Sequence, residues 1–135
     1  MNTLEDLLYG DGAFTKIDID EVVTDILSAF QRDDEEKLMR SIRSCVAGVM
    51  DALRIESNLD LVYRLGKLYG YGAQKYAEYN WRMVESKRYV AALGRHAHAM
   101  ESGKIYDDET GIEHGIAVIW NCISLAYKIS EGSDD

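Results

Sequence analysis

Apolar side chains recur every three or four residues along four stretches of the chain, which is the period of an amphipathic α-helix. The stretches are residues 20–32, 34–54, 58–79 and 85–102. Asp18 with Glu21 has the spacing of a helix N-cap, as does Ser57 with Asp60, and Gly103 follows the fourth stretch as a C-terminal stop. The pattern therefore predicts four helices, each with one face turned to a core.

A fifth segment, residues 110–129, is apolar on nearly every side. Ile112, Ile116, Ile119, Ile123 and Tyr127 recur at helical spacing, and further apolar residues fill the other faces. Such a helix belongs in the middle of a bundle. Thr110 with Glu113 has the spacing of a capping box, which would place His114 in the first turn. The predicted fold is an all-α, single-domain bundle of about five helices around a central, buried C-terminal helix.

Four polar residues follow one stripe of this central helix: His114, Asn121, Ser124 and Lys128. A buried polar group without a partner costs about 1–3 kcal/mol, so something must face the stripe. One interpretation is that a neighbouring helix supplies hydrogen bonds to these side chains. The other is that the stripe belongs to a functional site.

Composition narrows the classes of function. The chain has 135 residues, 11 Gly, no Pro and a net charge of -9, which argues for one helical domain and against nonspecific nucleic-acid binding. A small phosphorylated ligand held by local cations stays compatible with this charge. Cys45 and Cys122 lie on apolar faces, as expected for reduced core thiols. Without a signal pattern or an apolar run of about 18 residues, we expect a cytoplasmic protein with no membrane partner.

Residues 75–82 bring cations, an amide and aromatic rings together in the sequence: Lys75, Tyr76, Asn80, Trp81 and Arg82. Such groups can bind phosphate and stack on a base. A packed helix corner has the same composition, so both interpretations stay open at this point.

Histidines and carboxylates cluster around the connection between the last two predicted helices. His96 and His98 point to opposite sides of a helix, and His96 has the apolar neighbours of an interior position. The short connection makes the two helices antiparallel. His96, His114 and a carboxylate from Asp107, Asp108 or Glu113 can then converge at one end of the bundle.

Two segments, GYGAQKYAEYNWRM and SKRYVAALGRHAHAMESGKIYDDETGIEHGIAVIWN, carry a resemblance to a phage family, the N-terminal domain of dATP/dGTP diphosphohydrolases. The resemblance covers roughly residues 59–129. The matching positions are Gly72, Ala73, Lys75, Tyr76, Asn80, Trp81, Arg82, Arg88, Tyr89, Arg95, His96, Gly103, Asp107, Glu109, Thr110, Gly111, His114 and Asn121. One departure is Ala117, where many members of the family carry a second histidine.

The resemblance implies hydrolysis of purine deoxynucleoside triphosphates to monophosphate and pyrophosphate, aided by a divalent cation, Mg²⁺ or Mn²⁺. It implies a catalytic role for His96, His114 and Glu113, and metal binding by Asp107 and Asp108. The implied substrate-binding residues are Lys75, Tyr76, Asn80, Trp81, Arg82, Arg88, Arg95 and Asn121. Residues 57–130 would form this hydrolase-like region, and the variable helices of residues 1–56 would mediate a homodimer in the host cytoplasm.

A rival hypothesis is a non-catalytic protein that sequesters a nucleotide or a host signalling nucleotide. Ala117 and the small number of convergent carboxylates favour it. A third hypothesis is a structural or host-interaction protein whose polar stripe is only a satisfied core. The His-Asp dipeptide of HD phosphohydrolases and the paired E-x-x-E and E-x-x-D helices of MazG-type pyrophosphatases are both missing, so the sequence contains no known metal constellation for this chemistry.

Overall fold

The computed structural model describes residues 18–75 and 80–132, which form five α-helices and one short 3₁₀ helix. In chain order these are α2 (Ile19–Gln31), α3 (Glu35–Ala52), α4 (Asn58–Lys75), η1 (Asn80–Met83), α5 (Ser86–Glu101) and α6 (His114–Glu131). The same residues contain no β-strand, and Tyr106 and Glu113 form an isolated antiparallel bridge. The predicted all-α fold is confirmed, and the helix bounds lie within a few residues of those expected.

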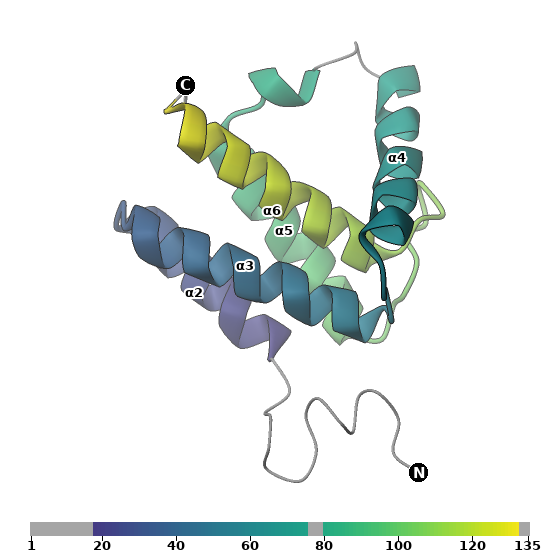
Figure 1. Cartoon of the computed structure of the whole chain (residues 1–135), viewed down its shortest axis with the longest axis horizontal. Coiled ribbons are helices and arrows are strands. Elements are labelled where there is room, and N and C mark those ends of the chain that lie inside the picture. The colour runs from purple at the N-terminus through teal and green to yellow at the C-terminus, as the bar shows by residue number, and fades with distance from the viewer. Residues whose placement is uncertain (1–17, 76–79, 133–135) are drawn as a thin grey trace, which may run out of the picture.

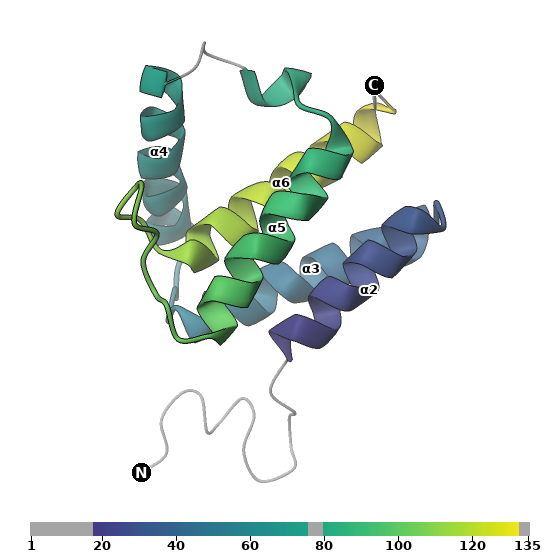
Figure 2. The same ribbon diagram turned by 180° about the vertical axis from the view of Figure 1, so that it is seen from behind.

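The helix α6 lies at the centre, as predicted. It packs against α5, α3, α4 and η1, while α2 packs on α3 and α5. Figure 1 shows the α2–α3 pair on one side of α6 and α4 on the other, and Figure 2 shows α5 lying along the opposite face of α6. Ile119 and Leu125 of α6 are completely buried, together with Ile26, Val49 and Leu93 from the surrounding helices.

The two cysteines belong to this core. Cys45 of α3 and Cys122 of α6 are free thiols and fully buried. A hydrogen bond with Cys45, together with burial, raises the pKa of the Cys122 thiol well above its ordinary value of 9.0. Because the thiolate is the reactive form, this environment suits a packing role, as the sequence predicted.

Helix α6 starts later than the sequence predicted. Its first residue is His114 and its N-cap is Glu113, which makes no side-chain capping bond, so the expected Thr110–Glu113 capping box is wrong. The Asp107 carboxylate accepts the backbone N–H groups of Glu109 and Thr110, which closes a turn before the helix begins. Gly111 then adopts a left-handed φ of 73°, a conformation that cannot continue into a helix. The other predicted caps hold, with Asp18 accepting from Glu21 N at 3.3 Å and Ser57 from Asp60 N at 3.1 Å.

Helix α4 stands at the side of the bundle and has α6 as its main neighbour. Its outer face exposes Leu59, Val62 and Tyr63, whose exposed fractions are 80%, 62% and 64%.

None of the described helices combines the length and the apolar character that crossing a membrane requires.

Candidate metal centre

Three side chains from three successive segments meet at one end of α6. His96 comes from the second half of α5, Asp107 from the α5–α6 connection, and His114 from the start of α6. The two Nδ1 atoms are 2.8 Å apart, and Asp107 Oδ2 lies 3.8 Å from His96 Nδ1 and 3.9 Å from His114 Nδ1. The predicted convergence of His96, His114 and one carboxylate is what the structure shows, with Asp107 as the carboxylate.

The backbone of the connection places these groups. Gly103, with a φ of 87°, follows the C-cap of α5 and turns the chain back. Asp107 N donates to Ile112 O and His114 N to Ile105 O, both at 2.8 Å, so the connection is closed on itself by main-chain hydrogen bonds. Asp107 and His114 are therefore positioned by backbone contacts as well as by packing.

The geometry of the three atoms fits one shared cation. The circle through the two Nδ1 atoms and Asp107 Oδ2, drawn from their three separations, has a radius of about 2.1 Å. Imidazole nitrogens and carboxylate oxygens bind Zn²⁺, for example, at about 2.0–2.2 Å. A cation at the centre of this circle would thus lie at bonding distance from all three atoms. Two imidazole Nδ1 atoms this close must otherwise share one proton in a hydrogen bond.

The surroundings of His96 favour its neutral imidazole, which is the form that can bind a metal ion. Burial lowers the pKa of this imidazole below its ordinary value of 6.5, and the neighbouring His114 lowers it further. Asp107 raises the pKa of His96, but its effect is smaller than that of burial or of His114. His96 is therefore neutral at pH 7, and a neutral imidazole is the form that binds a metal ion.

Glu113 is not part of the cluster of His96, Asp107 and His114. Its Oε2 accepts a hydrogen bond from Nη1 of Arg64 at 2.8 Å, across from α4. Arg64 also pairs with Asp60, with Nε and Nη2 at 3.2 and 3.1 Å from the two carboxylate oxygens. Sequence reasoning missed Arg64. The Asp60–Arg64 spacing of four residues signals a helix ion pair, but nothing in the sequence indicates the contact with Glu113.

Asp108, the other predicted metal ligand, also lies apart from the cluster. Its carboxylate is exposed and forms an ion pair with Lys104 Nζ at 2.8 Å. This pairing lowers the pKa of Asp108 below its ordinary value. Of the two predicted aspartates, the structure brings only Asp107 to His96 and His114.

Four of the predicted substrate-binding residues have described side chains, and two of them, Arg82 and Arg88, lie away from the cluster. The guanidinium of Arg82 lies 5.9 Å from the centre of the Tyr127 ring. Tyr127 itself lies about 20 Å along α6 from His114. Arg88 is exposed in the first turns of α5, about 12 Å along that helix from His96. The structure therefore does not bring these two cations to the cluster.

Arg95 lies closer to it, whereas Asn121 lies about 10 Å along α6 from His114. Arg95 is exposed, and its charge is near enough to contribute to the lowered pKa of His96. Asn121 is buried and donates its amide to Ala117 O of the same helix at 2.7 Å. Lys75 ends α4, and Asn80 and Trp81 begin η1, but their side chains and the whole of Tyr76 lie outside the described residues.

The fold and this cluster define a small helical protein with a candidate divalent-metal centre. Residues 48–135 match the model of the family described as dATP/dGTP diphosphohydrolase, N-terminal, and the chain belongs to this family. The match begins within α3, earlier than the resemblance noted from the sequence, and contains all three residues of the cluster. Comparison with curated proteins and with solved structures gave no match.

Proposed function

We propose that the protein is a metal-dependent hydrolase that converts purine deoxynucleoside triphosphates to monophosphate and pyrophosphate, with His96, Asp107 and His114 as the metal ligands. The observation that carries the proposal is the geometry of these three residues, which suits one cation and lies within the region of the family match. The substrate class is taken from the family description.

The donor set selects among metal ions. Mg²⁺ prefers oxygen ligands and an octahedral shell with several waters, whereas two imidazole nitrogens suit transition-metal ions. Of the two ions that the resemblance implied, Mn²⁺ is therefore the better fit. A divalent cation bound by these three residues supplies counter-charge for the phosphate oxygens of a nucleotide.

The surrounding residues have separate tasks in this proposal. His96 presents a neutral imidazole because of its lowered pKa. Arg64 holds the Glu113 carboxylate, so Glu113 would act as a base towards water beside the cluster and not as a metal ligand. Arg95 is the predicted phosphate-binding cation that lies near His96.

The sequestration hypothesis is the second candidate, and one observation favours it. Within the described residues, the cluster contains a single carboxylate, because Asp108 pairs with Lys104 and Glu113 with Arg64. A site poor in free carboxylates can bind a nucleotide–metal complex without supplying a base for water.

The test is incubation of the purified protein with dATP or dGTP, with Mn²⁺, Mg²⁺ or a chelator, followed by chromatography. We expect monophosphate and pyrophosphate with Mn²⁺, and loss of turnover in His114→Ala. His98→Ala is the matched control, because His98 is an exposed histidine on α5 outside the cluster. A nucleotide that stabilises the protein but is recovered intact would support sequestration. Neither binding nor turnover with any purine nucleotide would refute both candidates.

A further inference from the structure

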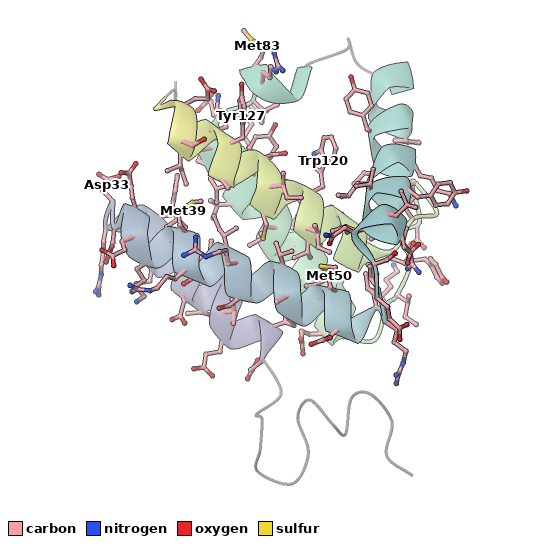
Figure 3. All side chains as sticks on the ribbon, in the orientation of Figure 1. Asp33, Met39, Met50, Met83, Trp120 and Tyr127 are labelled. Carbon is pink, nitrogen blue, oxygen red and sulfur yellow. The ribbon has the colours of Figure 1, made fainter. Side chains whose placement is uncertain are left out.

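A pair of aromatic rings lies between α4 and α6. The rings of Tyr69 and Trp120 have their centroids 6.0 Å apart and are tilted by 44°. In Figure 3, Trp120 projects from the side of α6 that faces α4. Between His114 and Cys122 every residue of α6 is buried except Trp120, which is only half-buried, as is Tyr69.

Both rings are only partly covered: Trp120 belongs to the central helix α6, and Tyr69 to the peripheral helix α4. Here α6 is the main neighbour of α4, and α4 carries other exposed apolar residues. Part of each ring therefore remains available to a planar ligand, and nucleobases stack on such rings.

The two rings and the candidate metal centre lie close to each other along the contact between α4 and α6, which we call the junction. Arg64 of α4 contacts Glu113 at the start of α6, and Tyr69 of α4 contacts Trp120 further along α6. From the helical rise, the second contact lies about 7 Å beyond the first along α4 and about 10 Å beyond it along α6. His114, a candidate metal ligand, is the residue next to Glu113.

We propose that Tyr69 and Trp120 bind the purine base of the nucleotide, with its phosphates directed along the junction towards the candidate metal centre. This inference rests on the proposed function and extends it, since it assigns the base to a pair that the sequence did not single out. The sequence had suggested Trp81 or Tyr76 for base stacking. The order of groups along the junction matches a nucleotide, with an aromatic pair at one end and, at the other, the cluster of His96, Asp107 and His114 that would hold a cation.

The experiment uses 2-aminopurine deoxyribonucleoside triphosphate, a fluorescent purine nucleotide whose emission falls when it stacks on an aromatic ring. With Mn²⁺ present, we expect quenching by the wild-type protein, and Kd and KM raised about tenfold or more in Trp120→Leu. Trp120→Phe, which keeps an aromatic ring, should lie between the two. Binding of tripolyphosphate, which has no base, should be unchanged in all three.

Three further variants separate the alternatives. Tyr69→Leu should weaken nucleotide binding in the same way, and it provides a second test if Trp120→Leu does not fold. Ile123→Ala removes another exposed apolar side chain of α6 and should leave binding unchanged. Trp81→Leu tests the residue suggested by the sequence.

The outcomes distinguish this inference from the function on which it rests. If folded Trp120→Leu and Tyr69→Leu bind the nucleotide as tightly as the wild type, the base lies elsewhere, while turnover by the wild type still supports the proposed function. A loss of binding in Trp81→Leu alone would likewise exclude Tyr69 and Trp120 as the base-binding pair. If the wild type binds tripolyphosphate but no purine nucleotide, both proposals are overturned.

Discussion

The Nδ1 atoms of His96 and His114 lie 2.8 Å apart, although 18 residues separate them in the sequence. The contact exists because the connection between α5 and α6 closes on itself, so that the end of one helix faces the start of the next. Asp107 of that connection completes the cluster. The candidate metal centre thus comes from one continuous stretch of chain, and metal binding there can be tested directly.

Mn²⁺ should raise the melting temperature of the protein. A ligand that binds only the folded state at 100 times its Kd stabilises that state by about 2.7 kcal/mol. We expect differential scanning fluorimetry to show this shift for the wild type and for His98→Ala. His114→Ala and Asp107→Ala should lose it, since each removes one of three ligands. An equal shift in all four proteins would place the cation elsewhere.

The metal-free protein should lose stability in mild acid through His96. Burial and His114 lower the pKa of this imidazole below 6.5 in the folded state. Between that lowered pKa and 6.5 the unfolded chain binds more protons than the folded one, so the free energy of unfolding decreases as the pH falls through this range. Urea titrations at about pH 7.5 and about pH 5.5 measure the effect. His96→Gln cannot titrate and should show a weaker pH dependence; an identical dependence would remove His96 as its cause.

Arg64 should matter more for stability than an exposed arginine in a similar helix pair. Its guanidinium is 28% exposed and links α4 to Glu113, whose side chain is 20% exposed. Arg64→Met should lower the free energy of unfolding by about 1 kcal/mol, between the values for surface and buried ion pairs. Arg40 pairs with Glu36 on the surface of α3 and provides the control. Arg40→Met should change stability by less than about 0.5 kcal/mol, and equal effects in urea denaturation would contradict the structural role of Arg64.

Two glycine-to-alanine substitutions should change the stability of the protein in opposite directions. A Cβ at Gly115 would lie 2.7 Å from Leu53 Cδ1 and 3.0 Å from Val49 Cγ1. Gly115→Ala should therefore destabilise the protein by about 1–3 kcal/mol, because α3 packs directly on the first turn of α6. A Cβ at Gly66 of α4 would meet nothing within 4 Å, so Gly66→Ala should stabilise the protein by up to about 1 kcal/mol through helix propensity. Thermal melts of both variants test the packing of α6 against α3.

Much of the fold was predictable because the helices have clear apolar stripes and short connections. The stripe of α3 predicted its buried residues Leu38, Ile42 and Cys45. The early start expected for α6 was wrong because two local patterns competed: Thr110 and Glu113 have capping-box spacing, but the Asp107 carboxylate and Gly111 form a turn there instead. Spacing alone does not reveal which hydrogen bond Asp107 makes.

The candidate site was predictable only where its parts are close in sequence. His96 and His114 could be placed together with one carboxylate from Asp107, Asp108 or Glu113, because a short connection joins antiparallel helices, but the sequence did not select Asp107. The contact between Arg64 and Glu113 spans 49 residues and depends on how α4 docks on α6. The spacing of apolar residues along the chain does not predict that docking. Arg82 and Arg88 share the family motif with His96, yet both lie towards the opposite end of α5 and α6 from the cluster. Proximity within a motif therefore did not predict proximity in space.

The position of α4 at the side of the bundle has a consequence for motion. Because α6 is its main neighbour, α4 has fewer contacts to lose on local opening than α3, α5 or α6. Such a helix forms its own unit of local opening, and its amide protons should exchange with solvent faster than those of α5 and α6. A nucleotide that bridges α4 and α6 would have to suppress this opening, so part of its binding energy would be spent on ordering one helix.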